Sequence, residues 1–271
     1  MPRVAVVGNL ARDVVNGGAP SPGGCPFFAG ETFRRLGASG QIVTRFAPPD
    51  RELFEPALAA LETPVTLLAA GTTSGFSLDY EGEERLMGVT GIGETWQPGD
   101  AAALSPDVTW VHVAPLLRSD FPPETLAALA DGRRLSLDGQ GLVRAPEIGP
   151  LVSNAEFDRA VLASVTTLKL SEEEARMVAG GSFDHSSAAA LGVPEVILTL
   201  GSHGAVVFTS GGDTFVPAAW PVLGVQTTGA GDTFMVAFAA SRAEGLTAVA
   251  AARAASRVVA EMLEGRKGDT R

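Results

Sequence analysis

The sequence predicts an α/β protein in which a mainly parallel sheet is covered by helices on both faces. Short apolar runs rich in Val, Ile and Leu alternate along the chain with longer runs of helical spacing, and this order is typical of βαβ units. The strand-like runs are mostly apolar, as expected for strands that are buried on both faces. With 271 residues, 45% of them hydrophobic, the chain can enclose a large core.

The first predicted strand is Val4–Gly8, an apolar run that is too short for a signal peptide. Further strands are predicted at Val65–Ala70, Val108–Val113, Arg134–Asp138, Thr166–Leu170 and Glu195–Leu200. Helices are predicted at Glu31–Leu36, Glu52–Leu61, Pro123–Ala130, Glu172–Ala179, Gly231–Ala243 and Thr247–Leu263. A hairpin is predicted at Ala205–Thr209 and Thr214–Pro217, because the Ser-Gly-Gly-Asp segment between them favours a turn.

One segment, from Gly71 to Met87, alternates apolar and polar residues around Glu81-Gly82. This alternation predicts a solvent-facing hairpin instead of a buried parallel strand. Together with Asn16–Gly24 it can form a small β lid that covers a substrate and excludes water; a surface hairpin without function is the alternative. We assign residues 1–12, 23–68 and 92–271 to the core and residues 13–22 and 69–91 to the lid.

The composition argues against several classes of function. A formal net charge of -11 is unfavourable for a nucleic-acid partner, which would select a basic surface. No apolar run is long and uninterrupted enough for a membrane span. Cys25 is the single cysteine, so no internal disulfide can form, and a cytoplasmic location is expected.

The stretch Thr228-Gly229-Ala230-Gly231-Asp232 carries the strongest functional signal. It precedes an apolar run of helical spacing, and the start of a helix offers unpaired N–H groups and a partial positive charge to an anion. Glycines let the backbone approach a ligand closely. An acid at an anion site is explained if its carboxylate takes a proton from a hydroxyl that attacks phosphate. The alternative is an ordinary helix start, where Asp is common.

Set among other motifs, this stretch resembles the signature of the ribokinase/PfkB-type carbohydrate kinase family. The companions, in the order that the family shows, are Gly8 with Asp13, the double glycine Gly23-Gly24, the hairpin at 72–87, and Thr199-Leu200-Gly201-Ser202-His203-Gly204. Asp138-Gly139-Gln140-Gly141-Leu142-Val143-Arg144 most resembles the short myo-inositol-kinase-like branch. The motifs of P-loop kinases and of Rossmann dehydrogenases are missing.

The resemblance implies a ribokinase-like three-layer sandwich with a small β-sheet lid. It also implies ATP- and Mg²⁺-dependent phosphorylation of a hydroxyl of a small sugar or polyol, with myo-inositol or a related carbohydrate favoured. Asp232 is the implied general base, and the amides of Gly229, Ala230 and Gly231 are the implied anion hole. The implied substrate-binding residues are Asp13, Gly23, Gly24, Asp138, Gln140 and Arg144. The implied nucleotide-binding residues are Lys169, Ser171, Thr199, Gly201, Gly204 and Thr228. A nucleoside kinase and a non-catalytic regulatory protein that binds sugar or nucleotide remain the alternatives.

Several positions depart from the family pattern. Gln226 replaces an acid that helps hold a monovalent cation in the family, so potassium activation is not expected. Ser171-x-x-Glu174 replaces Asn-x-x-Glu; Glu174 is implied to hold Mg²⁺ through water, and the same four residues predict a helix capping box. The asparagine expected near Phe28 is missing. His112 is predicted to be a satisfied core histidine. A homodimer through the exposed edge of the lid is a further possibility.

Overall fold

The computed structural model describes residues 3–81, 84–222 and 224–268, so Gly82 of the predicted lid turn lies outside the described residues. Within these ranges the main sheet has nine strands in the order β14-β13-β12-β11-β9-β8-β1-β4-β5. Neighbouring strands run parallel except β12 with β13 and β13 with β14. The strands are β1 (Val4–Asn9), β4 (Gly40–Arg45), β5 (Val65–Leu68), β8 (Trp110–Val113), β9 (Arg134–Asp138), β11 (Thr167–Ser171), β12 (Glu195–Thr199), β13 (Gly204–Thr209) and β14 (Gly212–Pro217).

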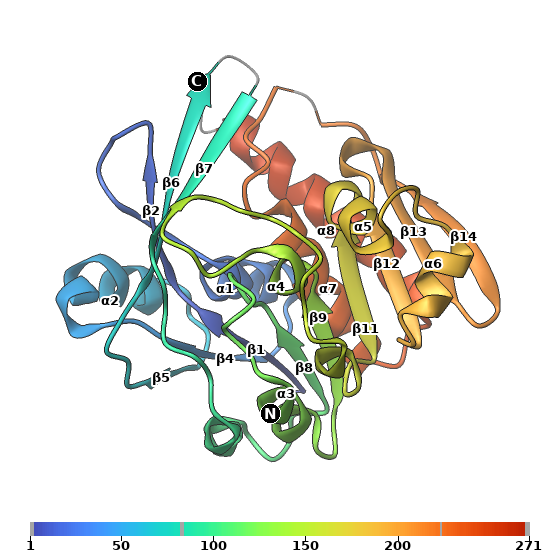
Figure 1. Cartoon of the computed structure of the whole chain (residues 1–271), viewed down its shortest axis with the longest axis horizontal. Coiled ribbons are helices and arrows are strands. Elements are labelled where there is room, and N and C mark those ends of the chain that lie inside the picture. The colour runs from blue at the N-terminus through green and yellow to red at the C-terminus, as the bar shows by residue number, and fades with distance from the viewer. Residues whose placement is uncertain (1–2, 82–83, 223, 269–271) are drawn as a thin grey trace.

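Helices cover both faces of this sheet, as the sequence predicts (Figure 1). Alternate residues of β1 point to opposite faces: Val4 and Val6 pack with α1, α7 and α8, whereas Ala5 and Val7 join the core under α3, α5 and α6. The helices are α1 (Cys25–Leu36), α2 (Arg51–Ala59), α3 (Pro123–Ala130), α4 (Gln140–Val143), α5 (Glu172–Ala179), α6 (His185–Ala190), α7 (Ala230–Ala243) and α8 (Ala248–Gly268). Short 3₁₀ segments are η1 (Pro48–Asp50), η2 (Pro98–Ala103), η3 (Arg159–Leu162) and η4 (Gly201–His203).

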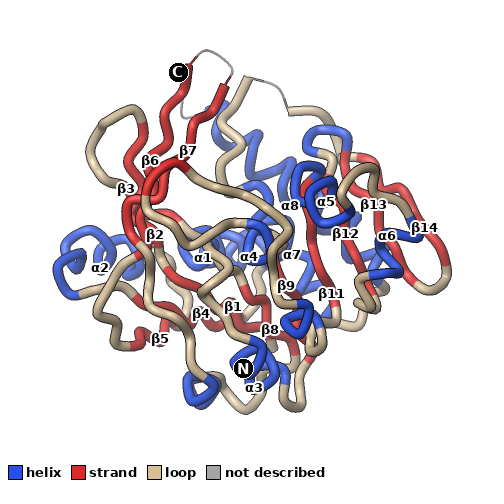
Figure 2. The backbone as a smooth tube through the Cα atoms, viewed as in Figure 1, coloured by secondary structure: helices blue, strands red, loops and turns tan. Residues whose placement is uncertain are grey.

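A second, smaller sheet stands beside the main one (Figure 2). Its five described strands lie in the order β10-β7-β6-β2-β3, with bounds β2 (Ala11–Val15), β3 (Ser21–Gly23), β6 (Ser74–Glu81), β7 (Glu84–Gly91) and β10 (Gly149–Pro150). Phe76, Leu78 and Val89 pack on Leu116 and Leu117 of the core. The predicted hairpin and the Asn16–Gly24 region therefore do share one sheet, while the exact division of the chain into core and lid stays a prediction.

Several elements differ from the sequence-based expectation: β2, α4 and α6 were not predicted, and β4, α1 and β10 differ for reasons that the structure shows. The strand β4 was not predicted, although Ile42 and Val43 are buried at its centre, because Gln41, Thr44 and Arg45 mask the apolar run. The helix α1 begins at Cys25 and not at Glu31, since Gly24 adopts a φ of 90° that turns the chain into the helix ahead of Pro26. The strand β10 was also not predicted, because its two residues are too few to give a sequence signal. None of the described helices is long and apolar enough to cross a membrane.

Candidate active site

A cavity of about 1220 Å³ lies between the carboxyl ends of the parallel strands and the second sheet. Ligands of open α/β sheets bind at this edge. The predicted substrate-binding residues that line it are Asp13, Gly24, Asp138, Gln140 and Arg144. The predicted catalytic, nucleotide and metal residues that line it are Lys169, Ser171, Glu174, Thr228, Gly229, Gly231 and Asp232. The fold thus gathers twelve predicted residues around one cavity.

The start of α7 is left open toward this cavity. Its N-cap, Gly229, has a φ of 79° and makes no side-chain cap. The helical ladder begins with the Thr233 N–H, which donates to the Gly229 carbonyl at 2.9 Å. The N–H groups of Gly231 and Asp232 precede that bond and are available to an anion. The Ala230 N–H instead donates to the Thr227 carbonyl at 3.0 Å, and Ala230 does not line the cavity.

Phe28 explains why a glycine stands at the N-cap of α7. A Cβ added at Gly229 would lie 2.5 Å from the Phe28 ring, and the positive φ already disfavours any other residue. Phe28 lines the cavity at the position where the family pattern predicts an asparagine. The Phe28 ring offers a ligand no polar contact where the amide would have offered one. It also packs close to Gly229 at the start of α7.

Asp232 sits in the first turn of α7 and is surrounded by ionisable neighbours. Burial raises the pKa of its carboxyl, the negative charge of Asp138 raises it further, and Lys169 lowers it, which leaves it at about 6. The Cys25 thiol hydrogen-bonds this carboxyl, and both burial and the Asp232 charge raise the pKa of the thiol. A carboxyl with a pKa near neutrality is suited to accept a proton.

Lys169 lies between Asp138 and the start of α7. Its Nζ lies 3.8 Å from Oδ1 of Asp138, and a Cβ at Gly231 would lie 3.4 Å from the same Nζ. Burial lowers the pKa of Lys169, but the carboxylates of Asp138, Glu174 and Asp232 outweigh it and hold the pKa above its usual value. Lys169 therefore carries a positive charge next to the open start of α7.

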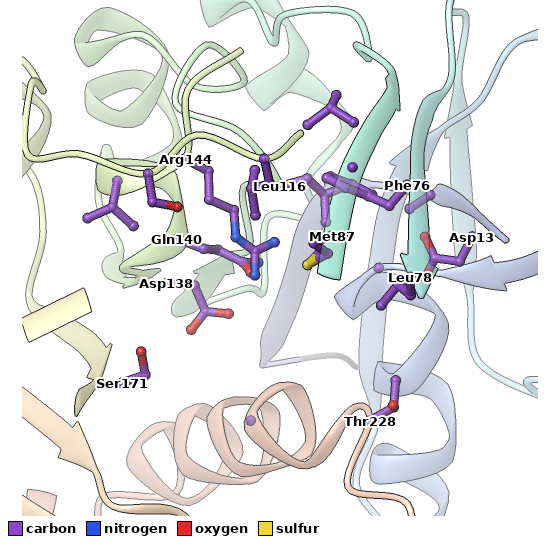
Figure 3. Close-up of a pocket in the computed structure, with 18 of the residues that line it drawn as sticks. Asp13, Phe76, Leu78, Met87, Leu116, Asp138, Gln140, Arg144, Ser171 and Thr228 are labelled. Atoms are coloured by element: carbon purple, nitrogen blue, oxygen red, sulfur yellow. The ribbon is translucent and has the colours of Figure 1, made fainter. Parts of the chain in front are cut away.

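Asp138 ends β9 and is nearly fully buried. Its Oδ2 lies 3.9 Å from Nε2 of His112, whose Nδ1 is 3.1 Å from the Ser136 hydroxyl. Burial lowers the pKa of His112, so the ring is neutral beneath the cavity floor. His112 is buried in the core, as predicted, but it is not fully satisfied, because its Nε2 makes no hydrogen bond and faces Asp138. Gln140, which begins α4, and Arg144, which follows its end, line the cavity beside Asp138 (Figure 3). The sequence did not predict this one-turn helix.

The start of α5 is closed by its own side chains. The Glu174 N–H donates to the Ser171 hydroxyl at 3.2 Å, and the Ser171 N–H donates to Oε2 of Glu174 at 2.8 Å. The predicted capping box is therefore confirmed. Among the described residues, no group of three His, Cys, Asp or Glu side chains could hold a metal ion directly. A single carboxylate ligand such as Glu174, which lines the cavity, is what we expect for an Mg²⁺ ion held mostly by water and phosphate.

Asp13 lies on the opposite side, on β2 of the second sheet (Figure 3). A Cβ at Gly23, across the β2–β3 pair, would collide with the Asp13 carboxylate, so Gly23 makes room for the acid without lining the cavity itself. Apolar side chains that the sequence did not single out complete this wall, namely Phe76, Leu78, Met87 and Leu116. The sequence signal for Phe76, Leu78 and Met87 was the alternation in the hairpin, and Leu116 lies outside that segment.

Three predicted nucleotide-binding residues, Thr199, Gly201 and Gly204, are not among the described residues that line the cavity. The Thr199 hydroxyl donates to the Leu170 carbonyl at 3.2 Å, and Gly201 opens the 3₁₀ turn η4. A Cβ at Gly204 would collide with the Val216 carbonyl. Local structure thus accounts for each of them, and their role toward a nucleotide stays a prediction.

An acid and a lysine at an open helix start, facing a cavity with further polar side chains, fit an α/β phosphotransferase. The profile described as pfkB family carbohydrate kinase matches residues 92–269. The chain belongs to this family, whose members transfer a phosphoryl group to a hydroxyl. No curated protein sequence matches the chain significantly.

Solved structures agree on the fold. A pyrophosphate-dependent kinase of the ribokinase family, complexed with a pyrophosphate analogue and myo-inositol, has a TM-score of 0.82 at 23% identity, covering 96% of this chain and 95% of that one. Arabidopsis thaliana ribokinase with ribose and ATP has a TM-score of 0.71 at 18% identity, covering 97% and 93%. Vibrio cholerae fructokinase, as a double mutant with fructose, ADP and potassium, has a TM-score of 0.70 at 19% identity, covering 96% and 90%.

Proposed function

We propose that the protein is an ATP-dependent kinase that phosphorylates a hydroxyl of a small sugar or polyol, with myo-inositol or a related carbohydrate favoured. The observation that carries this proposal is the position of Asp232. Its carboxyl, with a pKa of about 6, sits in the first turn of an uncapped helix that faces the same cavity as Asp13 and Asp138.

In the proposed reaction Asp232 takes the proton of the acceptor hydroxyl as that oxygen attacks the terminal phosphorus of ATP. The bond from this phosphorus to the bridging oxygen breaks, and ADP leaves with the electron pair. General-base help of this kind contributes roughly 10²–10⁴-fold. The amides of Gly229, Gly231 and Asp232, and the ammonium of Lys169, are proposed to stabilise the charge that builds on the phosphoryl oxygens. Glu174 is proposed to hold Mg²⁺ through water, and the ion would neutralise donor charge.

Hydroxyl recognition is proposed for Asp13, Asp138, Gln140 and Arg144. Carboxylates accept hydrogen bonds from hydroxyls, the guanidinium donates, and an amide does both. The apolar wall on the second sheet, including Met87, supports packing against the C–H face of a ring. These contacts favour a polyol over a nucleoside, because the described wall offers charged partners to several hydroxyls.

Pyrophosphate is the second candidate donor. The residues predicted to bind the nucleotide at Thr199, Gly201 and Gly204 do not line the cavity, whereas Lys169 and the α7 amides, which suit phosphate alone, do. The similarity to a pyrophosphate-dependent kinase supports the same donor.

A matrix of donors and acceptors tests both choices. ATP and pyrophosphate are each combined with inositols, pentoses, hexoses, sugar acids and nucleosides in the presence of Mg²⁺, and donor consumption is followed. We expect acceptor-dependent consumption with a polyol. Turnover with nucleosides alone would favour the nucleoside kinase. Donor binding without turnover on any acceptor would favour the non-catalytic regulatory protein.

We also propose a cellular location and an oligomeric state for the protein. The single cysteine, Cys25, is buried, which agrees with a cytoplasmic location; fractionation of cells tests it. The second sheet is the proposed surface of a homodimer, since Val15 and Leu86 are 41% and 45% exposed on it. Light scattering tests this, and the mass of a single chain would contradict it.

A further inference from the structure

Arg266, near the end of α8, reaches back to the loop that leads into α7. Its Nη1 donates to the carbonyl oxygen of Gln226 and to that of Thr228, each at 2.8 Å. The two carbonyls are 40 and 38 residues away in sequence, so this contact closes the loop onto a distant helix. Both oxygens point at one positively charged group, which is the arrangement that carbonyl oxygens adopt around a bound cation.

The contact lies directly upstream of the proposed anion hole. Between the two bonded carbonyls lies Thr227, whose own carbonyl accepts the Ala230 N–H at 3.0 Å. Arg266 therefore fixes the segment on both sides of the residue that sets the turn into Gly229. If these carbonyls were left without a cation, their dipoles would repel one another and the turn would lose its anchor, because each carbonyl needs a donor or water.

We propose that Arg266 is a built-in cation that positions the α7 loop for phosphoryl transfer and makes a bound monovalent cation unnecessary. The inference rests on the proposed function. Gln226 brings no charge to this loop, so an alkali ion would meet only neutral oxygens, whereas the guanidinium supplies its own positive charge and keeps it at every physiological pH. A related fructokinase was solved with potassium bound; here the charge is covalently attached to α8.

Arg266 is a positioning residue, because it touches the loop and not the reacting atoms. Arg266→Ala is therefore expected to lower kcat by about tenfold through a misplaced loop, with little change in the KM of the acceptor. Guanidinium ion added to this variant is expected to restore part of kcat. Arg253→Ala, an exposed arginine on the same helix, is the matched control and is expected to behave as wild type.

Hydrogen exchange of the peptide that spans residues 226–231 gives a readout that does not need turnover. We expect faster exchange in Arg266→Ala than in wild type or Arg253→Ala. The melting temperatures of the three proteins are expected to be equal. If no donor and acceptor pair supports turnover in wild type, the proposed function fails, while the exchange result still tests the anchor.

Potassium provides the sharpest arm. Wild type is expected to show equal kcat in potassium and lithium. The double variant Gln226→Asp/Arg266→Ala lacks the guanidinium and gains a carboxylate next to the space that the guanidinium filled. We therefore expect potassium to raise the kcat of this variant more than lithium does. Strong potassium activation of wild type would overturn the inference. So would Arg266→Ala with unchanged kcat and unchanged exchange at 226–231.

Discussion

The starts of α5 and α7 both face the cavity, and they are built in opposite ways. The start of α5 is closed by Ser171 and Glu174, which bond each other's backbone N–H groups. The start of α7 begins with Gly229, which makes no side-chain cap. The first helix satisfies its own donors, and the second leaves donors for a ligand. The start of α5 therefore presents a carboxylate to the cavity, whereas the start of α7 can bind an anion.

The same difference explains where the acid stands. At α5 the carboxylate of Glu174 is held by its own helix, and at α7 the carboxyl of Asp232 shares its surroundings with Asp138 and Lys169 and has a pKa of about 6. A capped helix fixes an acid, whereas an uncapped helix lets an acid and a phosphoryl group meet. Substitutions at the two starts should therefore affect turnover and stability in different proportions.

The largest effect is expected from Asp232→Asn. The amide keeps the shape but cannot take a proton, so kcat should fall roughly 10²-fold or more while donor binding stays nearly intact. Steady-state kinetics and donor titration measure the two quantities. A kcat within a few-fold of wild type would remove Asp232 from the role of base.

Gly229→Ala should have the next largest effect. The new Cβ would meet the Phe28 ring at 2.5 Å, which shifts the anion-binding amides, and we expect kcat to fall by about tenfold. The control is Gly180→Ala at the end of α5, where φ is 68° and no atom lies within 4 Å of the new Cβ. It carries the same backbone strain and should keep kcat. Equal losses in both variants would mean that strain alone explains the result.

Acidification below pH 6 should lower kcat by about tenfold for each unit of pH, a factor similar to that expected for Gly229→Ala. The base works only when ionised, so kcat should be half-maximal near pH 6 and fall about tenfold for each unit below that. Because the charge of Asp138 helps raise the pKa of Asp232, Asp138→Asn should shift this midpoint to lower pH. A pH–rate profile measures both enzymes, and an unshifted midpoint would contradict the coupling.

The smallest effect is expected from Ser171→Ala at the closed start of α5. Loss of the cap should cost about 1 kcal/mol of unfolding free energy and lower kcat only a few-fold, by loosening Glu174. Denaturant unfolding and kinetics measure the two. Asp184→Ala removes the cap of α6, where Asp184 accepts from the Ser187 N–H, outside the cavity lining, and should leave kcat unchanged. A loss of kcat as large as that of Gly229→Ala would make α5 part of the anion site.

Local signals in the sequence predicted much of this site. The α7 loop, the capping box and the strands β9 and β11 are each specified by consecutive residues, and so their positions at the sheet edge followed from βαβ order. The support for them could not be predicted. Phe28 behind Gly229, Arg266 on the α7 loop and the strand β4 depend on contacts between residues far apart in sequence, which no local pattern records.

The central claim is that the open start of α7 transfers a phosphoryl group to a hydroxyl. Phosphorus NMR of wild type with Mg²⁺, donor and the acceptor found by screening tests it most directly. The account predicts a phosphomonoester resonance on the acceptor that grows in step with loss of the donor and stays absent with Asp232→Asn over the same time. Donor and acceptor that both bind without any such resonance, or a donor that yields inorganic phosphate alone, would contradict it.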